Sequence, residues 1–380
     1  MTKPLDGIRV LDLSRLYPGP YCSMILADFG AEVLCIEDRR YASEPSMPSA
    51  MRNKRHMSLD LASAGGREIF LRLARDADVL LEGFRPDTMK RLGLDYPALR
   101  EGNPRLVYCA ITGFGQTGPY RDMVGHDVNY LALGGVLGNI GTGPDALPAI
   151  PGTQIADVAA GGMNAAIGIL LALMARERSG EGQYIDVSMT DGIVAMNGYA
   201  AVFLWLLGES LEPGRSMLTG KYPWYRVYRC ADGRDLSIGA VEMRFWKRLC
   251  EHFDVAEWAP LQHDDAKAPE MHAFFEARFA EKSRDAWFEE LRCLDVCVAP
   301  VLDPREAFES SQVKARDLVV EVEKDGLRQK LLGIPIKLSE TPGSVESPPP
   351  TFGEHTDQVL SSLGYDAEAI ARLRRSGDVS

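Results

Sequence analysis

The first third of the chain alternates short apolar runs with helical stretches. Gly7–Leu13 is a β-branched run that follows a turn signal. A Pro-Gly-Pro turn, a helical stretch at Tyr21–Ala31 and the apolar run Val33–Glu37 come next. Strand, turn, helix and strand within about 30 residues predict a βαβ unit of a parallel sheet.

The same order continues along the chain. Gly65–Ala77 has the pattern of an amphipathic helix, and Ala77–Glu82 and Leu106–Ile111 have the pattern of buried strands. We therefore predict an α/β fold whose large domain contains a doubly wound, Rossmann-like parallel sheet. The glycines of this region do not form GxGxxG, so we predict neither NAD nor FAD as a cofactor.

The pattern changes in the second half of the chain. A long helix is predicted from Val158 to about Arg178, and Tyr184–Met189 is predicted to be a strand. From about Tyr222 a hairpin with a turn at Asp232–Gly233 is followed by charged amphipathic helices. We predict a large domain at 1–215 and a smaller α+β domain at 222–325. Residues 326–380 then form a linker, Pro-rich at 344–353, and a segment that returns to the large domain.

Two stretches, Val158–Ala175 and Gly192–Gly208, are apolar enough to raise the question of a membrane span. Both are rich in glycine and alanine and follow an aspartate, so we interpret them as buried helices of a large protein. The N-terminus lacks the apolar core of a signal peptide. We expect a cytoplasmic protein without a membrane segment.

Composition narrows the functional classes. The chain has 380 residues, which favours two domains, and a net charge of −12 argues against sequence-independent nucleic-acid binding. The seven cysteines are odd in number and form no CxxC pair, which is typical of reduced intracellular thiols without a metal site. An anionic ligand would need a local basic cluster.

Such a cluster occurs after the second predicted strand, in or near a loop, and Arg85 follows a later strand. Its members are Arg39, Arg40, Arg52, Lys54 and Arg55. Arginine and lysine at the carboxyl ends of parallel strands suit phosphate groups. The alternative is a solvated charged loop, and the spacing alone does not decide between them.

Three other residues are candidates for chemistry. His126 lies beside Gly125 after a glycine-rich loop, although a lone histidine is often only a structural hydrogen-bonding group. Asp157 precedes an apolar helix, where it is either an ordinary N-cap or a carboxylate beside backbone N–H groups that stabilise an oxyanion. Glu242 is a single acid in an apolar and aromatic run, so it either has a partner or faces solvent at a helix start.

Taken together, these segments resemble the class III CoA-transferase superfamily (CaiB/BaiF-like) from end to end. The matching segments are LDLSRLYPGPYCSMILADFGAEVLCIE, RNKRHMSLDL, DVLLEGFRPDTMKRLGL, ITGFGQTGPY, ADVAAGGMNAAIGILLALMARERSGEGQYIDVSM and FGEHTDQVLSSLGY. The resemblance implies an acyl-CoA thioester substrate, a CoA-binding large domain and an interlocked homodimer with sites between the chains. Asp157 matches the aspartate that serves as nucleophile in the transferases.

Within this superfamily the chain is most similar to the α-methylacyl-CoA racemases. Gly125-His126-Asp127-Val128-Asn129-Tyr130 has the racemase form of a segment in which transferases carry an aromatic residue, and Glu242 falls in a racemase-like GA-V-E pattern. The resemblance implies that His126, Asp157 and Glu242 are catalytic. It implies that the CoA contacts are Arg39, Arg52, Arg55, Leu59, Arg85, Gly125, Asp127 and Tyr130. Since Asp38 follows Glu37 where racemases carry arginine, either Arg39 or Arg40 fills that role.

The expected reaction is racemisation of a 2-methylacyl-CoA through an enolate. His126 and Asp157 would exchange one proton with the α-carbon from opposite faces, and backbone N–H groups after Asp157 would bind the thioester oxygen. CoA is then part of the substrate, and no other cofactor is needed. Three alternatives stay open: a CoA-transferase with Asp157 as nucleophile, a non-catalytic acyl-CoA-binding protein, and, disfavoured by the glycines, an NAD-dependent oxidoreductase.

Overall fold

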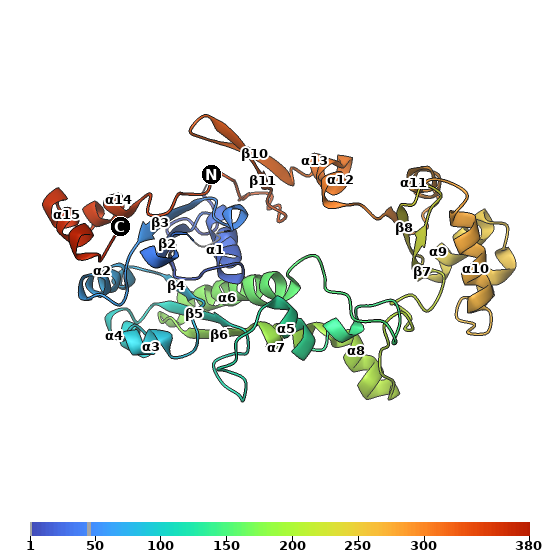
Figure 1. Ribbon diagram of the computed structural model, residues 1–380, viewed down its shortest axis with the longest axis horizontal. Coiled ribbons are helices and arrows are strands. Elements are labelled where there is room, and N and C mark those ends of the chain that lie inside the picture. The colour runs from blue at the N-terminus through green and yellow to red at the C-terminus, as the bar shows by residue number, and fades with distance from the viewer. Residues whose placement is uncertain (1, 44–46) are drawn as a thin grey trace. The chain divides into compact units, whose positions relative to one another are not determined.

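A computed structural model describes residues 2–43 and 47–380 (Figure 1). Contacts group the chain into two compact units. The first contains residues up to Val136, Pro151–Met196 and Ser311–Ser380, and the second contains Leu137–Ile150 and Asn197–Ser310. This grouping differs from the predicted boundaries, because 137–150 and 197–215 belong to the second unit and 311–325 to the first.

The first unit is built on a six-stranded parallel sheet in the order β3-β2-β1-β4-β5-β6. The strands are β1 (Arg9–Asp12), β2 (Glu32–Glu37), β3 (Lys54–Ser58), β4 (Val79–Glu82), β5 (Val107–Thr112) and β6 (Tyr184–Ser188). This is the doubly wound order, so the predicted α/β class is confirmed. The strand order reverses between the neighbouring parallel strands β1 and β4, which is where such sheets bind ligands.

Strand β3 corrects the prediction of a basic loop, because Lys54 and Arg55 lie inside it. Lys54 is buried, and its Nζ donates to the Pro20 carbonyl at 2.8 Å and to Ser23 Oγ at 2.7 Å. Asp12 lies 3.8 Å from the same ammonium. Partners on other elements balance the charge of Lys54 and allow it to be buried. The segment KRHMS therefore forms a strand although it lacks the apolar pattern from which strands are predicted.

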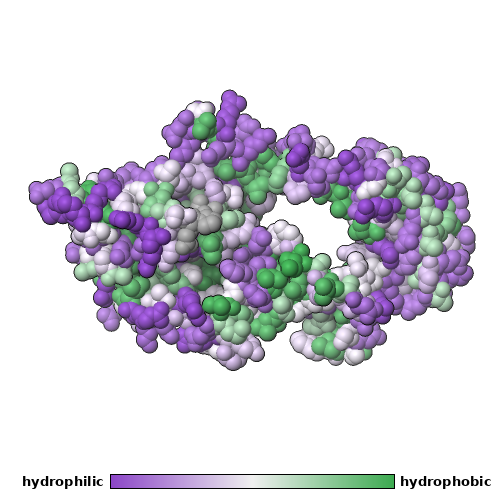
Figure 2. Space-filling model, viewed as in Figure 1, coloured by the Kyte–Doolittle hydropathy of each residue, from purple (hydrophilic) through white to green (hydrophobic). Residues whose placement is uncertain are grey.

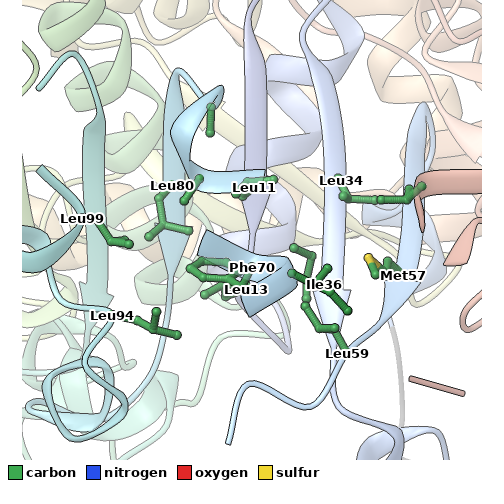
Figure 3. Close-up of a cluster of buried hydrophobic side chains, with 14 of the residues drawn as sticks. Leu11, Leu13, Leu34, Ile36, Met57, Leu59, Phe70, Leu80, Leu94 and Leu99 are labelled. Carbon is green, nitrogen blue, oxygen red and sulfur yellow. The ribbon is translucent and has the colours of Figure 1, made fainter. Parts of the chain in front are cut away.

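Helices cover both faces of the sheet. Those of the first unit are α1 (Pro18–Asp28), α2 (Ala64–Arg75), α3 (Thr88–Leu92), α4 (Tyr96–Gly102), α5 (Asp127–Leu133), α6 (Asn164–Ser179), α7 (Met189–Met196), α13 (Ser311–Ala315), α14 (Thr356–Ser362) and α15 (Ala367–Ser376). Leu11, Leu34, Met57 and Leu80 of the strands pack with Phe70 of α2 in one buried cluster (Figure 3). This packing fixes the carboxyl ends of the strands relative to one another.

Helix α1 begins at Pro18, three residues earlier than predicted, because proline is favoured in the first turn of a helix. Its start packs on the π-helix η4 (Ala156–Met163), which continues into α6. A Cβ atom at Gly162 would lie 2.8 Å from the Pro18 carbonyl oxygen. Glycine at 162 therefore allows η4 to approach the loop that follows β1.

The C-terminal part of the first unit adds the hairpin of β10 (Val319–Lys324) and β11 (Leu327–Leu332). The Pro-rich stretch that follows has no helix or strand, and it is held by Asn53, whose Oδ1 accepts from the Ser347 amide at 3.0 Å. Helix α14 then packs on β3. The chain end thus completes the edge of the sheet.

The second unit combines a three-stranded antiparallel sheet with helices. Its strands are β7 (Tyr225–Arg229), β8 (Asp235–Gly239) and β9 (Val298–Pro300); its helices are α8 (Gly198–Val202), α9 (Met243–His252), α10 (Ala268–Phe279), α11 (Arg284–Leu291) and α12 (Pro304–Glu309). The predicted hairpin is present, with Gly233 in a left-handed conformation in its turn. Trp224, Trp246, Phe275 and Trp287 are buried in its core.

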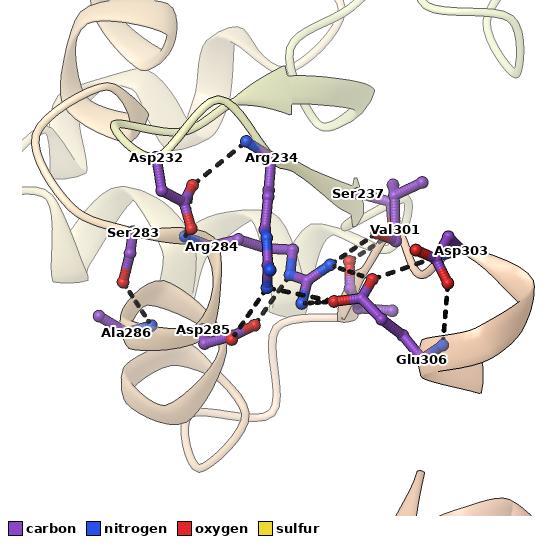
Figure 4. Close-up of polar contacts among 11 residues, drawn as sticks. Asp232, Arg234, Ser237, Ser283, Arg284, Asp285, Ala286, Val301, Asp303 and Glu306 are labelled. Atoms are coloured by element: carbon purple, nitrogen blue, oxygen red, sulfur yellow. Dashed lines mark hydrogen bonds and ion pairs between the residues drawn. The ribbon is translucent and has the colours of Figure 1, made fainter. Parts of the chain in front are cut away.

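A buried arginine ties α11 to α12 in this unit (Figure 4). Arg284 forms two parallel bonds of 2.9 Å to the Glu306 carboxylate and a third of 2.8 Å to Asp285. The Arg284 guanidinium lowers the pKa of Glu306 to about 2. Bidentate pairing of this kind fixes geometry as well as charge.

The two apolar stretches that were expected to be buried are only partly so. Ile167, Leu171 and Met174 of α6 are exposed, and no residue of the π-helix η5 (Phe203–Leu207) is buried. Ala156–Ser179 has the length and apolarity of a membrane span, as a core helix can, and 44% of its most apolar window is buried. The single chain thus carries apolar surface, part of which is green in Figure 2.

Candidate active site

A hollow of about 230 Å³ lies at the carboxyl ends of β1, β4 and β5. Its walls come from the loop after β1 at 14–18, the loop after β4 at 83–86, and the loop after β5 between Gly113 and His126. A Cβ atom at Gly83 would lie 3.6 Å from the Ser14 Cβ, so the first two loops touch. The hollow therefore occupies the point where the strand order reverses, the expected ligand position of this fold.

His126 lies on the wall of this hollow, directly before α5. Its backbone N–H donates to Asn129 Oδ1 at 3.0 Å, and its carbonyl accepts from the Asn129 amide at 2.8 Å. The backbone at the helix start is thus fixed, while the residue is exposed. An imidazole held this way can exchange protons with a molecule in the hollow.

Asp157 lies on the same wall, half-buried. It is the second residue of η4 and does not cap the helix, whose N-cap is Ile155. The N-cap interpretation is therefore wrong. A π-helix is uncommon and is often found at functional sites.

Asp127 joins the two candidates. Its Oδ1 accepts the Asp157 backbone N–H at 3.0 Å, which links the starts of α5 and η4. The next amide, that of Val158, donates to the Gln154 carbonyl at 3.0 Å. Both N–H groups therefore already have acceptors within the protein. This differs from the expectation that backbone N–H groups here bind the thioester oxygen.

The surroundings of Asp157 favour a proton on its carboxyl. Burial raises the pKa of Asp157 to about 6, nearby Asp127 adds to the rise, and His126 opposes it. Tyr130 is buried beside them and donates to the Gly125 carbonyl at 2.5 Å. Burial, with Asp157 next, raises the pKa of Tyr130 to about 12, so its hydroxyl stays neutral.

The residues expected to contact CoA fall into two groups. Arg85, Gly125 and Tyr130 line the hollow. Arg39 is exposed in the short helix η1 (Arg39–Tyr41), and Leu59 is buried in the core.

Two of the expected arginines point elsewhere. Arg52 is buried, and its Nε and Nη2 donate to the Asp28 carboxylate at 2.9 and 2.6 Å. Its Nη1 donates to the Leu332 carbonyl, so its donors are committed within the protein. Arg55 borders a separate hollow near the amino ends of β1 and β2, together with Arg9 and Arg72. Arg52 is buried and Arg55 lies within a strand, and neither lines the hollow. Arg85 does line it and is therefore better placed than these two to bind CoA there.

Glu242 belongs to the second unit, where it is exposed and forms the N-cap of α9 without a side-chain cap bond. It lies near Cys297, whose thiol pKa is raised chiefly by burial and then by Glu242. This placement agrees with the solvent-facing alternative for the single chain. Its part in catalysis stays a prediction.

Two arginines and a leucine are among the residues of the hollow that were not predicted. Arg15 and Leu16 follow β1, and Arg121 follows the glycine-rich loop. Arg15 Nε donates to Glu37 Oε1 at 2.8 Å, and its guanidinium lies 3.4 Å from the centre of the Tyr41 ring. Leu16 has a φ of 64°, a strained value for leucine. The signal for Arg15 and Leu16 in the sequence was their position between a strand end and a Pro-Gly-Pro turn.

This fold and this hollow define the class of the protein. The family model of CoA-transferase family III matches residues 5–356. The chain belongs to CoA-transferase family III.

Individual relatives include both reaction types. The chain is 37% identical to human alpha-methylacyl-CoA racemase over 374 residues, which cover 97% of this chain and 96% of the relative. It is 33% identical to the succinyl-CoA–L-malate CoA-transferase beta subunit of Chloroflexus aurantiacus over 400 residues, 98% and 97% of the two chains. A CaiB/BaiF family protein from Brucella suis superposes with a TM-score of 0.83 at 28% identity, covering 96% of this chain and all of that one.

Proposed function

We propose that this enzyme racemises 2-methylacyl-CoA thioesters, with His126 and Asp157 as the acid–base pair. The observation that carries the proposal is that an imidazole and a carboxyl of raised pKa line one small hollow. Histidine is the side chain that ordinarily titrates near neutral pH. A carboxyl with a pKa of about 6 can take up or release a proton near neutral pH at little cost.

The proposed chemistry consists of two proton transfers on opposite faces of the α-carbon. The basic member of the pair removes the α-hydrogen, the C–H electrons pass into an enolate, and the acidic member returns a proton to the opposite face. One member must be protonated and the other not, and the roles exchange in the reverse reaction. The enolate oxygen needs positive potential, for which Arg85 and Arg121 at the same hollow are the candidates.

The same proposal includes the CoA portion and a partner chain. Arg85, Gly125 and Tyr130 line the hollow and are proposed to contact CoA, with Arg39 or Arg40 at a phosphate. Exposed Leu171 and Trp205 support an interlocked homodimer that covers this apolar surface. In such a dimer Glu242 would reach the site from the partner chain.

The second candidate is transfer of CoA between carboxylic acids, with the Asp157 carboxylate as nucleophile. The similarity to a transferase over nearly the whole chain favours it. The Gly125-His126 pair, in place of an aromatic residue before Asp127, argues for the racemase.

Proton NMR of the purified enzyme with a 2-methylacyl-CoA in D₂O, without an acceptor acid, tests the proposal. We expect the α-proton signal to disappear as deuterium enters and the two stereoisomers to converge. His126→Ala and Asp157→Asn should each lower the exchange rate by about 10²-fold or more.

Asp357→Asn is the matched control, because Asp357 is an exposed acid that pairs with Arg374 at the surface. It should retain the exchange rate of the parent enzyme. Absence of exchange, with CoA transferred once succinate or formate is added, would replace the racemase by the transferase. Absence of both reactions across a panel of acyl-CoA thioesters would favour the binding-protein alternative.

A further inference from the structure

A buried carboxyl lies directly beneath the hollow. Glu82 is the last residue of β4, it is 6% exposed, and the next four residues, 83–86, line the hollow. No lysine, arginine or histidine of the described chain pairs with it. A buried carboxylate without a cation is costly, so the presence of Glu82 at this position indicates a function for its charge.

The carboxyl of Glu82 is bonded to the loop that follows it. Its Oε2 accepts the Phe84 backbone N–H at 2.7 Å, and the Tyr108 hydroxyl of β5 lies near the same carboxyl and lowers its pKa. The Phe84 side chain packs on the core from its position in the hollow wall. Since a charged acceptor binds an N–H more strongly than a neutral one, ionisation of Glu82 tightens the loop.

Two tyrosines and a cysteine near Glu82 stay neutral around pH 7. Tyr108 and Cys109 of β5 and Tyr184 of β6 have pKa values raised chiefly by burial. Two acids lie near these groups. Asp95 is close to Tyr108, and half-buried Asp186, whose pKa is raised chiefly by burial, is close to Cys109 and Tyr184. Burial raises the pKa of Glu82 itself to about 7, against the Phe84 and Tyr108 donors that lower it.

We propose that Glu82 is a positioning residue whose ionised carboxylate fixes residues 83–86, and with them Arg85, for binding of the CoA portion, and whose protonation loosens that loop. This inference rests on the proposed function only in naming CoA as the ligand of the loop. The hydrogen bond and the burial that carry it are independent of the reaction type.

Hydrogen exchange of the amides in 82–86, measured on the ligand-free full chain, tests the role of Glu82. After correction for intrinsic exchange, protection of the Phe84 amide should rise roughly tenfold as the pH passes upward through about 7. Glu82→Gln has nearly the same shape and no charge, so its protection should stay low throughout. Glu101→Gln, an exposed acid of α4, should behave as the parent chain does.

A second variant keeps the test decisive if Glu82→Gln does not fold. Tyr108→Phe removes one donor that lowers the pKa of Glu82, so the midpoint of the protection change should move to higher pH. Protection that is independent of pH in the parent chain, or identical in the parent and Glu82→Gln, would overturn the proposal.

Calorimetric titration with free CoA separates the two proposals. At pH 8, Glu82→Gln should bind CoA roughly tenfold more weakly than the parent, and the difference should vanish at pH 5.5. Equal CoA affinity at pH 8 would refute the assignment of the loop to CoA binding. A parent chain that does not bind CoA, but shows the exchange behaviour, would overturn the proposed function and leave the positioning role intact.

Discussion

At the scale of single residues, the site combines groups whose proton affinities are set by burial. Asp157 and Glu82 both have raised pKa values, about 6 and about 7, for the same first cause. They differ in position, because Asp157 lines the hollow and Glu82 lies behind its wall. One therefore suits proton transfer and the other suits support of the backbone.

The pH profile of racemisation follows from the shared proton. The equilibrium constant between enantiomers does not depend on pH, so both directions must require the same singly protonated pair. We expect one bell-shaped profile of kcat/KM for both enantiomers, with at least one limb within about a unit of pH 6. Initial rates measured between about pH 4.5 and 9 check this, and a flat profile across that range would contradict it.

The stability of the fold should also depend on Glu82. A free glutamate has a pKa near 4.3, so between about pH 4.5 and 7 the folded chain binds more protons at this site than the unfolded chain. The native carboxyl therefore loses stability as the pH rises through that window. Glu82→Gln should be as stable as the parent near pH 4.5 and up to about 3 kcal/mol more stable above pH 7. Urea unfolding at both pH values measures this, and equal stability at pH 8 would count against a desolvated charge.

At the scale of elements, the site depends on close packing between the start of α1 and η4. The glycines of η4 were visible in the sequence, but their purpose depends on Pro18, which is more than 140 residues away in the chain. Local patterns predicted β1, β2, β4 and β5, because their apolar runs are largely buried, and they predicted β6, which is partly exposed. They missed β3, whose Lys54 is balanced only by partners on other elements.

Gly162→Ala tests this packing. The added Cβ would meet the Pro18 carbonyl oxygen at 2.8 Å, a backbone atom that cannot move without shifting the loop after β1. We expect a loss of about 1–3 kcal/mol in unfolding free energy and a further loss of turnover, since Asp157 is on the same helix. Gly198→Ala in α8 is the control, because nothing lies within 4 Å of its added Cβ. Comparable losses in both variants would rule out a specific contact.

The residues of the candidate site also differ in whether the local sequence predicts their role. His126 and Asp157 could be predicted because glycines and a helix start mark their positions. The burial of Arg52 could not be predicted, because its pairing with Asp28 requires the folded sheet and α1. Arginine clusters in a sequence therefore predict charge, and only tertiary structure assigns each guanidinium to a ligand or to a buried acid.

At the scale of the whole molecule, the exposed apolar face of α6 bears on oligomeric state. Leu171 is 61% exposed near the middle of that helix. If a second copy covers this face, as proposed, Leu171→Glu should convert the dimer to a monomer by burying a charge. Sedimentation equilibrium measures the mass. Leu327→Glu, at a position 70% exposed on the β10–β11 hairpin, is the control and should stay dimeric. A monomeric parent chain would refute the homodimer.

The chain passes between its two units four times, and the first unit is completed only by Ser311–Ser380. During synthesis, every residue of the second unit leaves the ribosome before the last helices of the first unit have been made. Until then the first unit is incomplete, because β3 at the edge of the sheet lacks helix α14, which packs on it. Premature stop codons late in the gene would thus spare the second unit and leave the large one incomplete, exposing apolar surface to chaperones and proteases.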